Sequence, residues 1–235
     1  MKVWNWDGFW GYFTNAYLLE GAIWTVLLTL NTLVCGFFIA LGLATMRLST
    51  SRTLNRLAQG YIWVFRGTPL LVQLIIIYTG LPQLGLVRLS VLQSALIGLA
   101  LNEAAYLSEI LRGGILSVAK GQTEAARSLG LRRFQVFRLV VFPQALRVII
   151  PPLGNSVNGL LKTTSIASVI SMEELLRRGQ ILMQQRFEVL EVFMVVAIIY
   201  LGMTTCWDFV QRRIERHYGK AYGAIENRHM ARDDH

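Results

Sequence analysis

Long apolar runs separated by polar stretches dominate the pattern of this chain. The first run, from Gly21 to Met46, contains no charged residue, and crossing about 30 Å of hydrocarbon takes roughly 20 helical residues. Four further runs follow, at about Leu57 to Gly80, Leu89 to Ile110, Val148 to Met172 and Val189 to Val210. The pattern therefore predicts an all-α, polytopic membrane protein with about five transmembrane helices.

The basic residues predict how these helices are oriented. Most of the 23 Lys and Arg residues lie between the first two runs, between the third and fourth, and after the fifth. Loops rich in Lys and Arg stay in the cytoplasm, so we expect a bacterial inner-membrane protein with its amino terminus outside and its carboxyl terminus in the cytoplasm. This placement accounts for the net charge of +9 and the pI near 10 without a nucleic-acid partner.

Composition and missing motifs exclude most enzyme classes. Only 16% of the residues are charged, against about a quarter in an average globular domain. A phosphate-binding loop needs glycine directly before its lysine, but Leu161 precedes the only Lys-Thr pair, Lys162-Thr163. No zinc-protease pattern and no metal-binding cysteine spacing is present. We predict no catalytic residue, no metal and no cofactor bound by this chain.

The chain divides into three predicted parts. Segment 1–20 places Trp4, Trp6, Trp10 and Tyr12 among polar residues, which is typical of an amphipathic segment or aromatic belt contacting lipid at the outer surface. The transmembrane domain covers 21–211 and includes a long cytoplasmic loop at about 112–147. A cytoplasmic polar tail, 212–235, completes the chain.

The long loop is predicted to form a helix–turn–helix. Gln122 to Leu129 is rich in helix formers, and Gly130 follows as a helix-terminating residue. Leu131 to Val141 forms a second helical stretch, in which Phe134, Phe137 and Val141 make one apolar stripe. Pro143 is expected to break the chain before the next span, and Pro151-Pro152 to bend it further.

A basic loop with an apolar stripe fits two roles. It suits docking into a groove of another protein, and it equally suits an amphipathic helix lying on anionic lipid. The residues alone leave both roles open.

Polar residues inside the apolar runs are costly and therefore mark candidate functional sites. The candidates for a substrate pathway are Arg66, Gly67, Thr68, Asn102, Glu103, Lys162, Thr163 and Ser165. Arg66 either binds a substrate carboxylate or pairs with Glu103 or Glu109 to hold the bundle together, and we favour the pairing. The Gly67-Thr68-Pro69 sequence should interrupt its helix within the membrane.

Two other groups have simpler interpretations. Glu109 and Arg112 are three residues apart and are expected to form a helical ion pair. Thr163 and Ser165, next to Lys162, are small hydroxyl residues that pack helices closely.

Four motifs resemble those of the polar amino-acid branch of ABC importer permeases. Glu124-Ala125-Ala126, then Gly130, then Val140-x-Phe142-Pro143, resembles the family's E-A-A-x-x-x-G and I-x-L-P loop. The other three motifs are Phe65-Arg66-Gly67-Thr68-Pro69-Leu70 with Gln73, Leu101-Asn102-Glu103-Ala104-Ala105-Tyr106 with Glu109, and Pro152-Leu153-x-Asn155-Ser156 followed by Lys162-Thr163-Thr164-Ser165. The match covers about residues 20 to 215, in the family's order.

This resemblance implies a function and a set of partners. The chain would be the membrane subunit of an importer of histidine, glutamine, glutamate, arginine, cystine or a related amino acid. Its partners would be two copies of an ABC ATPase, which hold the ATP and Mg²⁺, an identical or homologous second permease, and an extracytoplasmic binding protein. Residues Glu124, Ala125, Ala126 and Gly130, with Pro143 closing the motif, would couple the permease to the ATPase.

One position departs from the family pattern. Related permeases often carry an acidic residue where this chain has Thr163, and such an acid could meet the substrate's amino group. We consider that Glu103 supplies the missing negative charge.

Two other functions are compatible with a polytopic chain. A secondary transporter or channel working alone would favour inverted repeats or a proton-relay pair and would leave the basic loop without a purpose. A membrane assembly factor would show no substrate-dependent effect when Arg66 or Asn102 is replaced.

Overall fold

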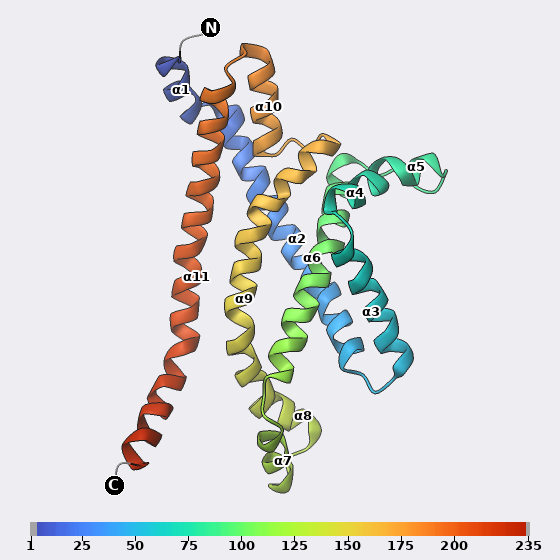
Figure 1. Cartoon of the computed structure of the whole chain (residues 1–235), viewed down its shortest axis with the longest axis vertical. Coiled ribbons are helices and arrows are strands. Elements are labelled where there is room, and N and C mark those ends of the chain that lie inside the picture. The colour runs from blue at the N-terminus through green and yellow to red at the C-terminus, as the bar shows by residue number, and fades with distance from the viewer. Residues whose placement is uncertain (1–3, 234–235) are drawn as a thin grey trace.

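The computed structural model describes the backbone of residues 4–233 and the side chains of residues 4–218. This part of the chain is helical, without a β-strand, and forms a long bundle with α10 at one end and α7 at the other (Figure 1). Its elements are α1 Trp6–Phe13, α2 Ala16–Leu48, α3 Arg52–Gly67, α4 Leu70–Ile75, the π-helical turn η1 Ile76–Gly80, α5 Leu81–Gln83, α6 Val91–Leu116, α7 Lys120–Ser128, α8 Arg133–Val136, the π-helical turn η2 Phe137–Val141, α9 Phe142–Thr163, the 3₁₀ helix η3 Thr164–Ile170, α10 Leu175–Arg186 and α11 Val189–Asp233.

Three helices are long and apolar enough to cross a membrane, namely Ala16–Leu48, Arg133–Ile170 and Val189–Tyr218. A fourth candidate is the pair formed by α3 and the segment Leu70–Gln83, which meet at a bend of 102°. The 26-residue helix α6 carries Glu103 and Glu109 and is not among these candidates. An all-helical membrane fold is confirmed, with three or four candidate spans.

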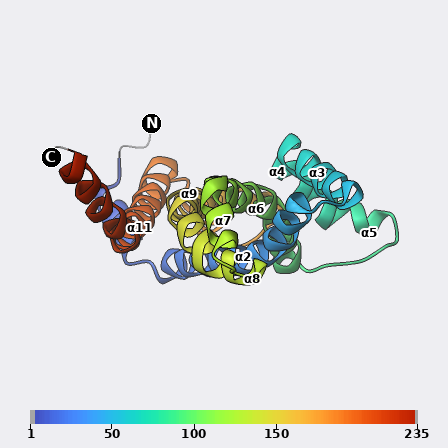
Figure 2. The same ribbon diagram turned by 90° about the horizontal axis from the view of Figure 1, so that it is seen from below.

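The predicted interruption of the second run is confirmed. Thr68 and Pro69 both adopt extended backbone conformations between α3 and α4, as expected for a proline and the residue before it. The bend turns the segment from α4 to α5 sideways from the bundle (Figure 1). In the view from below, α5 lies at the far end from α11 (Figure 2). What the sequence presents as one apolar run is therefore two differently directed helices.

The predicted break at Pro143 is wrong. Helix continues without a gap from Arg133 through η2 into α9, so Pro143 lies in the first turn of α9. The π-helical turn η2 directly precedes the turn of α9 that contains Pro143. Such π-helical turns are local insertions within an α-helix. The side chain of Gln144 donates to the carbonyl of Val140 at 2.9 Å. Pro151 and Pro152 likewise lie inside α9.

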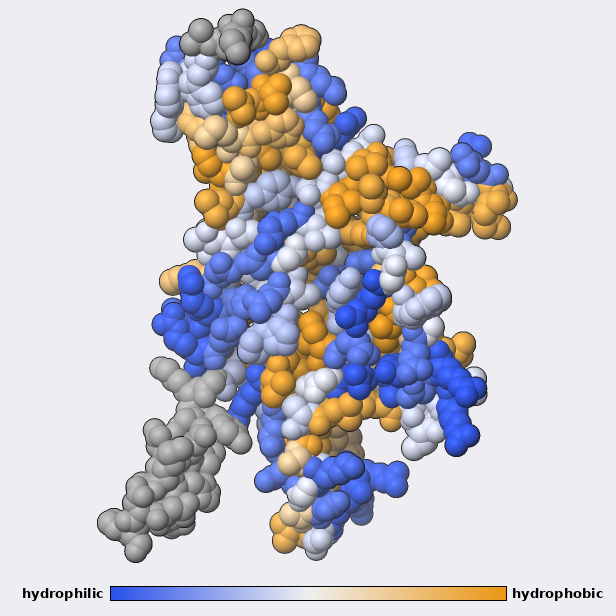
Figure 3. Space-filling view, viewed as in Figure 1, coloured by the Kyte–Doolittle hydropathy of each residue, from blue (hydrophilic) through white to orange (hydrophobic). Residues whose placement is uncertain are grey.

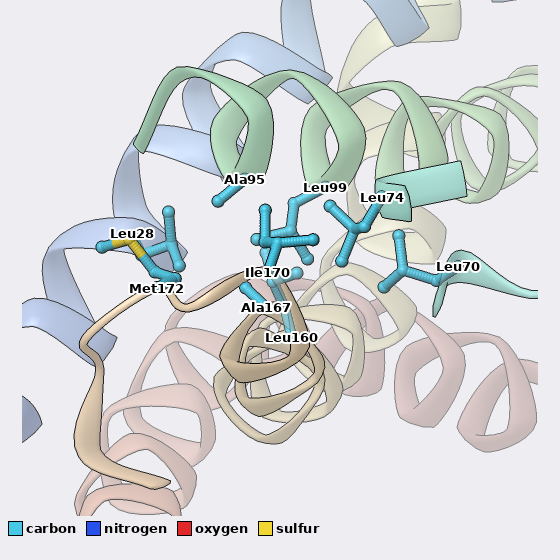
Figure 4. Close-up of a cluster of buried hydrophobic side chains, with 9 residues drawn as sticks. All are labelled: Leu28, Leu70, Leu74, Ala95, Leu99, Leu160, Ala167, Ile170 and Met172. Carbon is cyan, nitrogen blue, oxygen red and sulfur yellow. The ribbon is translucent and has the colours of Figure 1, made fainter. Parts of the chain in front are cut away.

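The core joins the central helices through small residues and leucines. One buried cluster contains Leu28 of α2, Leu99 of α6 and Leu160 of α9 (Figure 4). At Gly114 of α6, an added Cβ would lie 2.3 Å from Cγ1 of Ile149, so α6 and α9 reach this separation only with glycine there. Apolar side chains also cover the segment around α4 and η1, whereas hydrophilic residues gather near α7 (Figure 3).

Both predicted terminal segments contain helix in the part of the chain that the structure describes. Helix α1 exposes Trp6 and Trp10 and buries Tyr12. The helix of the first span already begins at Ala16. The predicted polar tail is helical in its backbone as far as Asp233, and its side chains from residue 219 onward lie outside the described part.

Candidate translocation cavity and docking loop

A cavity of about 910 Å³ lies between the end of α3, the start of α4, helix α6 and helix α9. Its polar lining consists of Arg66, Thr68, Asn102, Glu103, Tyr106, Glu109, Asn155, Ser156 and Thr163. The structure therefore brings together five of the eight predicted pathway residues. Gly67, Lys162 and Ser165 are not in this lining.

Two amide side chains, those of Gln73 and Asn102, stabilise the break between α3 and α4. Gln73 donates from Nε2 to the carbonyl of Phe65 at 3.0 Å and to the carbonyl of Thr68 at 3.2 Å. Asn102 donates from Nδ2 to the same Phe65 carbonyl and to Oε1 of Gln73, each at 3.1 Å. A helix end leaves carbonyls without partners, and these amides satisfy them. Asn102 thus supports the cavity wall as well as lining it.

Arg66 is not paired with an acid, contrary to the favoured prediction. Among the side chains of residues 4–218, neither Glu103 nor Glu109 forms a salt bridge with it. Its guanidinium carbon instead lies 5.2 Å from the ring centroid of Tyr106, a cation–π distance. Tyr106 lies on α6, one turn after Glu103. The guanidinium remains available to the cavity.

Glu103 lies in the wall between α6 and α9. The side chain is 8% exposed and accepts a hydrogen bond from the hydroxyl of Ser156. In the described part of the chain no cation forms a salt bridge with this carboxylate. Ser156 stands in one of the quoted motifs but was not among the predicted pathway residues. The spacing of Pro152, Ser156, Gly159 and Thr163 places them on one helical face.

The predicted ion pair of Glu109 is confirmed. Arg112 donates from Nη2 to Glu109 at 2.7 Å and from Nε to both carboxylate oxygens. Arg47 of α2 approaches the same carboxylate, with its Nε 3.6 Å from Oε1.

Lys162 and Ser165 lie elsewhere. They line a separate hollow of about 460 Å³ together with Tyr200 and Thr204 of α11. Thr163, one residue on, lines the main cavity. The K-T-T-S motif is therefore divided between two hollows.

The α7–η2 loop, residues 120–141, forms the predicted helix–turn–helix. Gly130 has φ +82°, in the left-handed region that favours glycine. Ala126 is buried with Val136 and Val141 in a small apolar cluster. This Ala126 therefore stabilises the loop internally, whereas Glu124 and Ala125 are exposed.

The predicted apolar stripe of this loop is only partly exposed. Phe134 and Phe137 are exposed, but Val141 is buried, because the stripe turns inward where η2 meets Ala126. Leu129, which sequence reasoning missed, is 83% exposed beside Gly130. The usable signal was its place in the turn, where a leucine has little to pack against.

Comparison with known proteins places the chain in a family. The family described as "Binding-protein-dependent transport system inner membrane component" matches residues 32–220. The nopaline transport system permease protein NocM of Agrobacterium fabrum is 42% identical, covering 80% of this chain and 81% of the relative. The glutamine transport system permease protein GlnP of Escherichia coli is 37% identical, covering 90% and 96%.

A solved structure has the same fold. A crystal structure of an amino acid ABC transporter with histidines matches with a TM-score of 0.81 and 38% identity, covering 86% of this chain and 94% of that one. The chain belongs to the family of binding-protein-dependent inner-membrane transport components, as the non-catalytic permease subunit of a polar amino-acid ABC importer whose ATPase is a separate subunit.

Proposed function

We propose that this permease passes an amino acid through the cavity between α6 and α9, using Arg66 and Glu103 as its two charged contacts. The observation that supports this most is that a guanidinium and a buried carboxylate line one cavity without an ion-pair partner among the side chains of residues 4–218. A guanidinium binds a carboxylate through two parallel hydrogen bonds. A buried carboxylate is costly until a cation joins it. An amino-acid zwitterion offers both complementary groups.

Other lining residues complete the proposed site. Thr163 and Thr68 offer neutral hydrogen-bonding groups, so the substrate's ammonium depends on Glu103 rather than on an acid after Lys162. Gly67 serves the site as the last residue of α3, and Lys162 and Ser165 act outside the main cavity. The site as a whole favours a polar substrate with one carboxylate and at least one cationic nitrogen.

The α7–η2 loop is proposed as the ATPase docking element. Glu124, Ala125 and Gly130 present or shape its surface, Ala126 stabilises it from within, and Pro143 begins the helix that leads away from it. Two ATPase copies carrying ATP and Mg²⁺ would engage this loop and that of an identical or homologous second permease. Exposed apolar residues with a basic rim support a protein partner over a lipid surface.

The same proposal fixes the orientation. The α7 end faces the cytoplasm, and the α1–α10 end receives the extracytoplasmic binding protein. With α6 crossing beside α2 and α9, and α3 with α4 counted as one broken span, the chain makes five crossings. The amino terminus is then outside and the carboxyl terminus inside, as the basic residues predict.

The experiment is ATP-driven uptake by the complete importer in proteoliposomes, with amino acids screened singly. Arg66→Gln and Glu103→Gln should each lower kcat/KM for uptake by about tenfold or more, because each removes a charged contact. Arg88→Gln is the matched control, since Arg88 is exposed outside the cavity. Wild-type kcat/KM in both cavity variants contradicts the proposed contacts, and uptake that needs no ATP contradicts the importer itself.

A further inference from the structure

Glu109 lines the part of the cavity toward the α7–η2 loop. Farther along the same wall the cavity is lined by Gly113 and Gly114, close to the end of α6. Arg112, on the same helix, takes both oxygens of the Glu109 carboxylate. This pair stays within α6 and therefore ties α6 to no other helix.

Arg47 forms a second ion pair with the same carboxylate, but it has no hydrogen bond to it. Its Nη1 donates to Oδ1 of Asn55 at 2.5 Å, and its carbonyl accepts from Nδ2 of Asn55 at 2.8 Å. Its Nε is buried without a hydrogen-bond partner, 3.6 Å from Oε1 of Glu109. That distance is too long for a hydrogen bond, and a buried donor left without a partner is costly.

The two arginines therefore share one carboxylate, and only Arg112 is hydrogen-bonded to it. Asn55 of α3 holds Arg47 at the end of α2, so a hydrogen bond from Arg47 to Glu109 would tie α6 more firmly to the α2–α3 hairpin. Either arginine can supply two donors to the carboxylate, so the two arrangements are alternatives of similar chemistry. We propose that Glu109 exchanges Arg112 for Arg47 during each transport cycle, and so acts as a positioning residue at the cytoplasmic end of the cavity.

The end of α6 is directly connected to the α7–η2 loop, so movement of this loop would drive the exchange. Helix α6 ends at Leu116, and α7 begins at Lys120. Ile115 and Val118 pack against the buried cluster of the α7–η2 loop. A displacement of this loop by the ATPase therefore moves the last turns of α6, where Glu109 and Arg112 lie. A packed element with two discrete contacts is the kind of device that couples distant sites.

This inference rests on the proposed orientation and docking role, and it is tested by the accessibility of one cysteine. Val148 is half-exposed and lines the same end of the cavity. The permease with Val148→Cys, Cys35→Ser and Cys206→Ser is assembled into the complete importer in inside-out vesicles. It is labelled with a membrane-impermeant maleimide, first without nucleotide and then with ATP and vanadate.

The exchange predicts two labelling rates in the otherwise unmodified importer, differing by about fivefold or more. Arg47→Gln leaves Glu109 only Arg112, and Arg112→Gln leaves it only Arg47. Each variant should therefore be labelled at one rate under both conditions. Arg47→Gln should be labelled at one of the two parental rates, and Arg112→Gln at the other. A purely structural ion pair predicts that both variants shift in the same direction.

Two controls accompany these variants. Arg56→Gln removes an exposed charge beside Asn55 and should keep both parental rates. In a Glu109→Gln background, Arg47→Gln and Arg112→Gln should become indistinguishable, since the shared carboxylate is gone.

Three results overturn the exchange: a parent with a single rate, arginine variants that keep both rates, or arginine variants fixed at the same rate. ATP-driven amino-acid transport by the parent importer in proteoliposomes tests the proposed function separately. A parent that keeps both labelling rates but transports no amino acid contradicts the proposed substrate and leaves the exchange standing.

Discussion

The two ends of this permease are built in opposite ways. At the α10 end, Glu174 is fully buried and caps α10, accepting hydrogen bonds from the backbone N–H groups of Leu176 and Arg177. The hydroxyl of Tyr200 also donates to it at 2.5 Å. Burial raises the pKa of the Glu174 carboxyl, and these donors act in the opposite direction. One carboxylate thus joins α10 to α11.

The α7 end is held together by far fewer buried contacts. Its docking loop is held by a small buried cluster of Ala126, Val136 and Val141. Its hydroxyl groups bond locally, as Thr123 to the carbonyl of Lys120 does at 2.7 Å. Elements that move are drawn from the less stable parts of a protein. The difference indicates a more rigid α10 end and a more mobile α7 end.

The largest effect should come from the α10 end. Glu174→Ala removes a helix cap and leaves buried donors without a partner, so it should lower the free energy of unfolding by about 3 kcal/mol. The measurement is the Tm of the purified permease in detergent. Glu173→Ala changes an exposed neighbour and is the matched control. Equal Tm values for the two variants would contradict a rigid α10 end.

The turn of the docking loop should show the next largest effect. Gly130→Val forces a β-branched residue to φ +82°, costing about 1–2 kcal/mol. We expect normal insertion into the membrane and a loss of ATPase in co-purification. Gly121→Val, in the same loop but with open space and no positive φ, should retain the ATPase. If both variants retain it, the loop does not need its left-handed turn.

The smallest effect isolates the docking surface from folding. Leu129→Ser removes an exposed apolar side chain, and it should weaken ATPase affinity about tenfold, or about 1.4 kcal/mol, while the Tm stays unchanged. Phe187→Ser removes a similarly exposed side chain at the α10 end. The ATPase affinity of the two variants is measured by titrating the ATPase onto each of them in nanodiscs. A loss of affinity in Phe187→Ser as large as in Leu129→Ser would contradict the division between the two ends.

Local chemistry made several features predictable from the sequence. The interruption at Thr68 and Pro69 and the turn at Gly130 follow from backbone restrictions on the residues themselves. The ion pair of Glu109 with Arg112 follows from helical spacing. In each case the deciding contact lies within a few residues along the chain.

The features that escaped prediction depend on contacts between helices. Spacing shows which residues share a face of α9, but not which neighbour that face meets. The close approach of α11 decides this, since a Cβ at Gly154 would lie 2.5 Å from the side chain of Gln211. Lys162 is thereby placed beside α11 and Thr163 in the main cavity. Arg66 escaped prediction similarly, because Tyr106 rather than an acid lies opposite it.

The uninterrupted helix that leaves the docking loop has a consequence for chain length. Arg133–Ile170 forms one continuous 38-residue helical segment, so the angular position of Ser156 in the cavity is set by the number of residues that separate it from the loop. One residue inserted into η2 would turn everything beyond it by about 100° and raise it by about 1.5 Å. Both ends could remain folded while the cavity lost its polar face. The length of this segment is therefore constrained as strictly as any side chain in the site.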